Sequence, residues 1–141
     1  MKRSLIRCTS AVSLGNAPEL NARVQHIAGK RFYLETFGCQ MNVSDSEIVS
    51  RVLLDAGLNR TESPDDADVI LTNTCAVREN AESKVWHRLK YFNSIKAKRK
   101  VVNRHSEPLT VGVLGCMAER ISKKILDESC ANFTCGPDAY R

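Results

Sequence analysis

Three cysteines, each directly after a strand-like run, constrain the fold of this chain most strongly. A helical pattern follows each of them. The cysteines are Cys39, Cys75 and Cys116, and the runs before them span residues 31–37, 68–74 and 109–114. Strand-like runs that alternate with helical patterns are typical of an α/β fold with a parallel sheet. We therefore expect one domain over residues 31–141, with an open, mostly parallel sheet and flanking helices.

Local signals place helices between these strands. Ser44 and Glu47 match a capping box, which predicts a helix start, and Gly57 fits the end of that helix. Its predicted buried stripe is Ile48, Val49, Val52, Leu53 and Ala56. Further helices are expected from about residue 78 to residue 100 and over residues 118–126. The segment 129–137 favours a short strand or a loop.

The three cysteines occupy equivalent places in this pattern. In an open parallel sheet, the connections after the strands emerge at one edge, where ligands bind. Three thiolates without a fourth suit a metal or cluster that keeps one exchangeable position, and an iron–sulfur cluster fits better than a closed zinc site. Gly38 and Gly115 precede two of the cysteines, and a residue without Cβ allows a close approach to a ligand. The spacing alone leaves buried, unligated thiols as an equal alternative.

The positive charge of the chain is confined to its first residues. Of 21 Lys and Arg and 16 Asp and Glu, six basic residues and one acidic residue lie in residues 1–31, which leaves the remainder neutral. Global basicity therefore does not indicate a nucleic-acid-binding face. Residues 1–30 are rich in Arg, Ser and Ala, which is typical of a mitochondrial transit peptide, although a disordered basic tail is the alternative. We expect a mitochondrial protein in which Cys8 is lost with the leader.

Composition excludes several other classes of protein. With 43% hydrophobic and 26% charged residues, the chain is neither collagen-like nor of low complexity. No run of about 18 apolar residues, the length of a transmembrane helix, occurs in the sequence.

Three motifs carry a specific resemblance to a known family. They lie at residues 34–42 (LETFGCQMN, followed by Asp45 and Glu47), at 73–82 (NTCAVRENAE) and at 115–119 (GCMAE). Together they resemble the N-terminal domain of the MiaB-type methylthiotransferases over about residues 31–141. GCQMN and GCMA are similar to the branch that acts on isopentenylated adenosine in tRNA. The leader and the ending GPDAY resemble the mitochondrial eukaryotic branch, which is named for association with the Cdk5 regulatory subunit.

The resemblance implies a cofactor and a reaction. Cys39, Cys75 and Cys116 match the three ligands of the family's auxiliary [4Fe–4S] cluster, which carries or relays sulfur to C2 of the modified adenosine beside the anticodon. The family uses S-adenosylmethionine at a second cluster to generate the radical that activates C2. tRNA is bound by the radical and C-terminal domains of the full-length enzyme.

The sequence also departs from the family. The Cys-x-x-x-Cys-x-x-Cys motif of the radical domain does not occur in the 141 residues, and we expect the radical and C-terminal RNA-binding domains to be absent. We therefore expect one domain of an enzyme that does not complete catalysis alone.

Two other functions remain open from the sequence. One is a non-catalytic interaction protein that binds a kinase activator or the full-length enzyme. The other is a zinc or thiol-redox module. Cys130 and Cys135 match no ligand position of the family, and structural or surface thiols are favoured over a second metal or redox pair.

Overall fold

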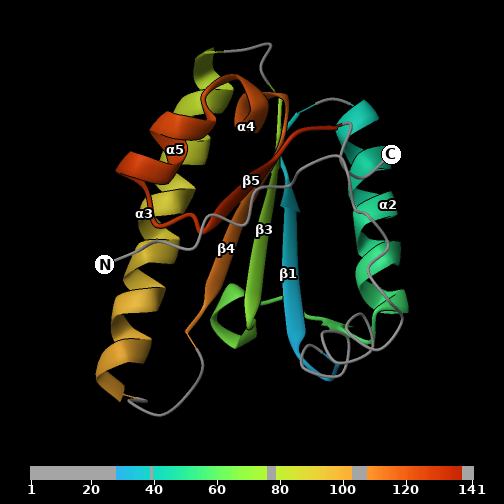
Figure 1. Ribbon diagram of the computed structural model, residues 1–141, viewed down its shortest axis with the longest axis vertical. Coiled ribbons are helices and arrows are strands. Elements are labelled where there is room, and N and C mark those ends of the chain that lie inside the picture. The colour runs from blue at the N-terminus through green and yellow to red at the C-terminus, as the bar shows by residue number, and fades with distance from the viewer. Residues whose placement is uncertain (1–27, 39, 76–78, 103–107, 138–141) are drawn as a thin grey trace, which may run out of the picture.

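The fold is built on a sheet of five parallel strands, seen nearly edge-on in the computed structural model (Figure 1). The structure describes residues 28–38, 40–75, 79–102 and 108–137. The strand order is β2-β1-β3-β4-β5, and all neighbours are parallel. The strands are β1 (Arg31–Thr36), β2 (Asn59–Arg60), β3 (Val69–Thr74), β4 (Thr110–Gly115) and β5 (Phe133–Cys135). The predicted open parallel sheet is confirmed.

Four helices flank the sheet on its two faces. In Figure 1, α2 covers one face, and α3, α4 and α5 lie on the other. The helices are α2 (Gln40–Asp55), α3 (Glu79–Val102), α4 (Cys116–Arg120) and α5 (Ser122–Glu128), and a 3₁₀ turn spans Pro64–Asp66. The arrangement is a three-layer α/β/α sandwich, and none of the helices in the described segments is long and apolar enough to cross a bilayer.

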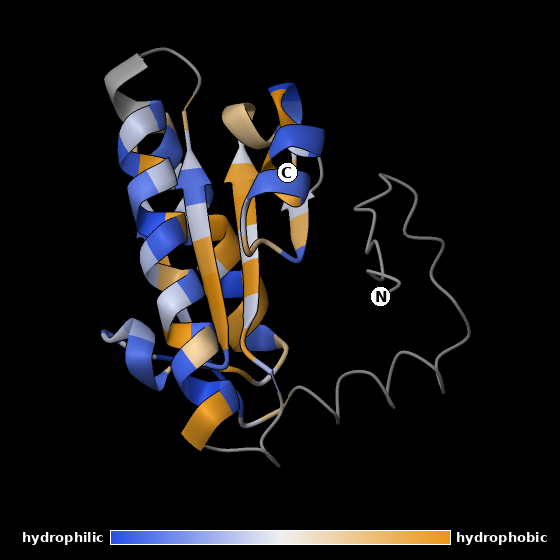
Figure 2. Cartoon of the chain, turned by 90° about the vertical axis from the view of Figure 1, so that its left-hand side faces the viewer, coloured by the Kyte–Doolittle hydropathy of each residue, from blue (hydrophilic) through white to orange (hydrophobic). Residues whose placement is uncertain are grey.

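Two apolar cores hold the three layers together. On the face covered by α3, a core forms around Ile70, Val111 and Val113 of the sheet and Leu89 and Phe92 of the helix, all at most 1% exposed. On the α2 face, a smaller core includes Phe32, Leu71 and Leu114. Figure 2 shows the hydrophobic residues gathered in the strands and the hydrophilic ones on the outer turns of the helices. The alternation along β3 assigns Ile70, Thr72 and Thr74 to the α3 face and Leu71 and Asn73 to the α2 face.

The capping-box prediction for α2 is wrong. The helix already includes Gln40, so Ser44 and Glu47 lie in its interior rather than at its start. Contacts between the first turns of the helix and the strands explain the earlier start: Asn42 binds β3, and Ser46 binds both β1 and β3. Tertiary hydrogen bonds here outweigh a local capping signal.

The end of α2 agrees with the sequence. Gly57 has a positive φ of +94°, its N–H donates to the Leu54 carbonyl, and the Leu58 N–H donates to the Leu53 carbonyl. This pair of hydrogen bonds is a Schellman motif, which satisfies carbonyls that the last helical turn leaves free.

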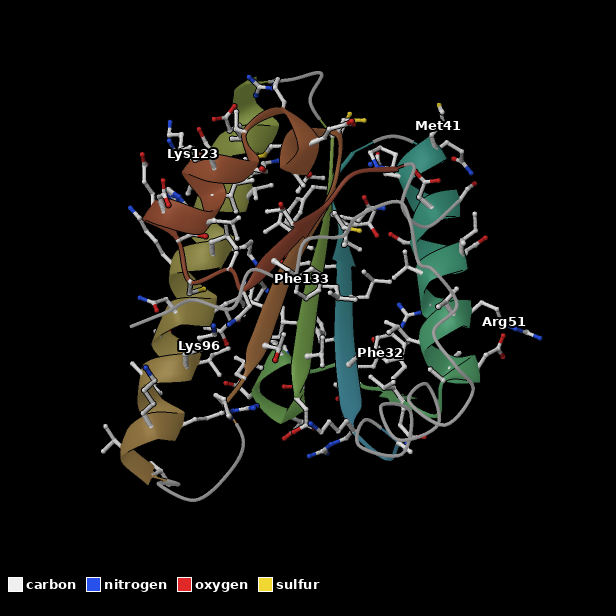
Figure 3. All side chains as sticks on the ribbon, viewed as in Figure 1. Phe32, Met41, Arg51, Lys96, Lys123 and Phe133 are labelled. Carbon is white, nitrogen blue, oxygen red and sulfur yellow. The ribbon has the colours of Figure 1, made fainter. Side chains whose placement is uncertain are left out.

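The buried face of α2 is rotated from the predicted stripe. Val49 is buried, whereas Ile48 and Val52 are 42% and 57% exposed. Much of the buried face is polar: Asn42, Asp45, Ser46 and Ser50 are all at most 7% exposed. In Figure 3, Arg51 points away from the sheet, and Met41 lies at the end of α2 beside the carboxyl ends of the strands.

The segment after β4 forms two helices where the sequence predicts one. Ile121 leaves the helical backbone conformation at φ −125° and ψ 35°, between α4 and α5. This change of direction lets Met117 and Ile125 both reach zero exposure in the core beside α3. The ambiguous segment 129–137 contains β5, which adds to the edge of the sheet, and the short strand β2 is not predicted at all.

Substitution of Gly115 tests how closely β4 approaches β3. A Cβ at Gly115 would meet the Thr74 carbonyl oxygen and lie 3.0 Å from the Thr74 nitrogen, whereas nothing lies within 4 Å of a Cβ at Gly29. Both glycines have positive φ values, +98° and +84°. We expect Gly29→Ala to cost about 1 kcal/mol from φ strain alone, and Gly115→Ala to cost about 3 kcal/mol because steric overlap adds to that strain. Urea unfolding of the two variants measures the difference, and equal costs would contradict this packing.

Candidate functional site

The candidate site lies at the carboxyl ends of β1, β3 and β4. The strand order reverses between β1 and β3: the connection from β1 leads to one side of the sheet, and the later strands add on the other. In open α/β sheets, this topological switch point is where ligand crevices form. The 2-1-3-4-5 order is that of flavodoxin-like sheets.

The connections after β1 and β3 touch at this point. Phe37 donates its N–H to the Asn73 carbonyl at 2.8 Å, which extends the pairing beyond Thr36. A Cβ built on Gly38 would lie 2.7 Å from Cys75 Cβ, so the backbone of Gly38 packs directly against that cysteine. Its φ of +142° is a conformation that suits glycine. The residue before Cys39 and the side chain of Cys75 are therefore in contact.

The connections after β3 and β4 are also adjacent. Thr74 and Gly115 are partners in the strand register, so Cys75 and Cys116 each follow one member of the same pair. Neighbouring strands lie about 4.8 Å apart. A Cβ on Gly115 would also lie 2.9 Å from Asn73 Oδ1, which shows how tightly β4 closes on β3.

The two described cysteines of this edge differ in exposure. Cys75 is half-buried after β3, and Cys116 is exposed as the first residue of α4. Cys39 lies outside the described residues. Within the described part of the chain, no three His, Cys, Asp or Glu side chains form a group that could hold a metal ion. In the sequence, Cys39 directly follows Gly38.

A buried polar network supports the edge from the α2 side. The Asn42 side-chain amide donates to the Thr74 carbonyl at 2.9 Å, and Asn73 Nδ2 donates to the Asn42 carbonyl at 2.8 Å. Asn73 Nδ2 also donates to Ser46 Oγ at 3.0 Å, and Ser46 Oγ lies 2.6 Å from Thr36 Oγ1. The network links the first two turns of α2 to the ends of β1 and β3.

The three hydroxyl side chains at this edge are not among the residues predicted from the sequence. Thr36, Ser46 and Thr74 carry hydrogen bonds at the strand ends, and Thr74 Oγ1 donates to the Leu114 carbonyl at 2.6 Å. A signal was available in the run of three polar residues, 72–74, inside an otherwise apolar strand. Polar residues at the end of a buried strand need hydrogen-bond partners, so they indicate a nearby polar site.

An ion pair lies on the opposite face, next to β1. Arg88 Nε is 3.0 Å from both carboxylate oxygens of Glu35, and its guanidinium lies 5.0 Å from the ring centres of Tyr91 and Phe92. The hydrogen bond that Arg88 donates to Glu35 raises the pKa of Arg88. Burial, followed by the charge of Glu35, raises the pKa of Tyr33, which donates to the same carboxylate. The ion pair fixes α3 against β1, two residues before Phe37.

Cys130 and Cys135 do not form a pair. Cys130 is half-buried against the core beside α3, where its thiol lies 3.3 Å from the Leu89 carbonyl, whereas Cys135 is buried in the core beside α2. Cys130 lines a groove of about 730 Å³ between α3 and residues 126–132. Burial raises the pKa of its thiol, against the opposing effect of Lys96. The two thiols lie on opposite faces of the sheet, which supports the structural interpretation and excludes a shared metal.

The chemistry of the edge suits a thiolate-bound metal centre. Cysteine thiolates are soft ligands that select iron–sulfur clusters, Zn²⁺ or Cu⁺. Gly38 and Gly115 lack the side chains that would collide with Cys75 and with Thr74, so the backbone packs closely there. The described residues thus offer two soft ligands at this edge, Cys75 and Cys116, and Cys116 is open to solvent.

The thiols should react with an alkylating agent in the order of their exposure. In metal-free protein at pH 8, we expect iodoacetamide to modify Cys116 first among the four described thiols and Cys130 and Cys135 much more slowly, because burial both shields Cys130 and raises its pKa. Timed quenching with peptide mass spectrometry gives the rates, and unfolding in guanidinium should make them similar. Equal rates for Cys116 and Cys130 in the folded protein would contradict this assignment.

Known proteins share this domain. The chain is 49% identical to a tRNA-2-methylthio-N(6)-dimethylallyladenosine synthase of Porphyromonas gingivalis over 111 residues, 79% of this chain and 23% of the relative. Proteins of the same name from Chlorobium luteolum and Parabacteroides distasonis are 49% and 46% identical, over 80% and 79% of the chain and 24% and 23% of their own lengths. The chain thus spans about a quarter of the length of these curated relatives.

A family match covers most of the domain described above. The model of the Uncharacterized protein family UPF0004 matches residues 31–136, which include all three strand-end cysteines. Because this match covers well over half of the chain, the protein belongs to the UPF0004 family.

Proposed function

We propose that residues 31–141 are the auxiliary cluster-binding domain of a tRNA methylthiotransferase, with Cys39, Cys75 and Cys116 as the ligands of a [4Fe–4S] cluster. The observation that carries this proposal is the contact of Gly38 with Cys75, together with the packing of Gly115 against Thr74. Through these two contacts, residues that directly precede the three cysteines lie together at one edge of the sheet.

The residues of the edge have distinct roles in this proposal. Three thiolates bind three irons and leave the fourth iron without a protein ligand. When bound, such a cluster supplies a place for an external sulfur species. Gly38 and Gly115 let the backbone pack closely against Cys75 and Thr74, next to the proposed ligands. The exposed position of Cys116 gives the open side of the site access to a substrate.

The proposed substrate class is tRNA that carries isopentenyladenosine beside the anticodon. The support is the name of the relatives, which are tRNA-2-methylthio-N(6)-dimethylallyladenosine synthases. The radical that activates C2 of the adenosine is proposed to come from a second domain with S-adenosylmethionine and its own cluster. The present domain would provide the sulfur, and other domains would hold the RNA.

Anaerobic reconstitution with iron and sulfide tests the ligand set. We expect about four irons and four sulfides per chain and a broad visible absorbance in the wild type. Cys39→Ala, Cys75→Ala and Cys116→Ala should each abolish this uptake, because the cluster then lacks one of its thiolates. Cys130→Ala is the matched control and should retain full iron content, since Cys130 lies beside α3, away from the edge.

Two outcomes would overturn the assignment. Equal iron content in wild type and Cys75→Ala would exclude Cys75 as a ligand. Tightly bound zinc without acid-labile sulfide, in protein purified without oxygen, would support the alternative zinc module instead.

We also propose that residues 1–30 direct the protein to mitochondria, as in the mitochondrial eukaryotic branch of the family. The support is the composition of the segment, which is basic and nearly free of acidic residues. Residues 1–30 fused to a fluorescent protein should accumulate in mitochondria of cultured cells. Replacement of Lys2, Arg3 and Arg7 by Gln should disperse the signal, and an unchanged mitochondrial signal would contradict the proposed role of the charges.

A further inference from the structure

We propose that Asn42 is a positioning residue that fixes the chain after β1 against Cys75 and so sets the spacing of the thiols. This inference rests on the proposed cluster-binding function and deepens it, because it assigns a role to a side chain that is not itself a ligand. Asn42 is 6% exposed and lies in the first turn of α2.

The side chain of Asn42 binds the backbone immediately before Cys75. Its Nδ2 donates to the Thr74 carbonyl at 2.9 Å and lies 3.5 Å from Asn73 Oδ1. Thr74 is fully buried, so its carbonyl has no access to bulk water. The hydrogen bond therefore satisfies the buried carbonyl of the last residue of β3, directly before Cys75.

A second hydrogen bond makes this connection reciprocal. Asn73 Nδ2 donates to the backbone carbonyl of Asn42 at 2.8 Å. The two asparagines, 31 residues apart, thus each bind the backbone at or next to the other. This double link fixes both the position and the orientation of the first turn of α2 relative to the end of β3, which one bond would not do.

Gly38 connects this link to the cysteine positions. A Cβ at Gly38 would lie 2.8 Å from Asn42 Cγ and 2.7 Å from Cys75 Cβ. The Gly38 backbone therefore packs between the Asn42 side chain and Cys75. The Asn42 side chain thus holds Gly38, the residue directly before Cys39, beside Cys75.

Local helix capping does not account for these contacts. A capping side chain bonds to the backbone of its own helix within about three residues. The Asn42 side chain instead reaches a carbonyl 32 residues away, on another element. Its role is therefore tertiary.

Metal-free protein provides a test that does not require the cluster. Phenylarsine oxide binds two thiols whose sulfur atoms lie close together, so its affinity reports the convergence of the cysteines. We expect Asn42→Ala and Asn42→Asp to weaken this binding by about tenfold, because a buried carbonyl loses its donor and the first turn of α2 is released. Peptide mass spectrometry should locate the wild-type adduct on two of the three strand-end cysteines.

The variants separate hydrogen bonding from volume and from general destabilisation. Asn42→Asp keeps the side-chain size and removes the amide donor, and it carries the test if Asn42→Ala does not fold. Ser50→Ala is the matched control, because Ser50 is a buried polar residue of the same helix, two turns farther along. It should bind the arsenical as the wild type does, and thermal unfolding of all variants measures their stability independently.

Reconstituted protein provides a second, spectroscopic measurement. We expect the Asn42 variants to show a changed EPR spectrum of the reduced cluster or a lower iron content, while Ser50→Ala matches the wild type. Wild-type arsenical affinity together with a wild-type EPR spectrum in Asn42→Asp would overturn the positioning role. If the wild type takes up no iron but the arsenical result holds, the cluster assignment fails and the positioning of the thiols stands.

Discussion

The close approach of three neighbouring parallel strands at their carboxyl ends determines most of what this domain can do. Parallel strands deliver every outgoing connection to the same edge, and the register of β3 with β4 places Cys75 and Cys116 after the same residue pair. Gly38 and Gly115 then allow backbone to pack where side chains would collide. The chemistry of the edge follows from this geometry, because two cysteines far apart in sequence directly follow paired residues at the ends of adjacent strands.

Much of the architecture could be predicted from the sequence, because the strands are buried and apolar. The runs before Cys39, Cys75 and Cys116 match β1, β3 and β4 closely, and the parallel sheet follows from their alternation with helices. Helix boundaries were less predictable. Ser44 and Glu47 carry a valid capping signal, but hydrogen bonds from Asn42 and Ser46 to the strands extend the helix past it. These contacts join residues that are 27 to 32 positions apart, so no local sequence pattern predicts them.

The positions of Cys75 and Cys116 after β3 and β4 were predictable, but the contacts around them were not. Equivalent places in a repeated strand-to-helix pattern identify the cysteines, whereas the reciprocal bonds between Asn42 and Asn73 depend on how the helix packs on the sheet. The same distinction applies to Cys130 and Cys135. They are close in sequence, yet Cys130, before β5, packs on the α3 face and Cys135, in β5, packs on the α2 face.

The unequal exposure of Cys75 and Cys116 makes the two sides of the edge differ in their access to solvent. Cys75 is half-buried behind Gly38, while Cys116 is open to solvent at the start of α4. An oxidant or a chelator therefore meets Cys116 before it meets Cys75. A centre held between these two thiols would lose its bond to Cys116 before its bond to Cys75.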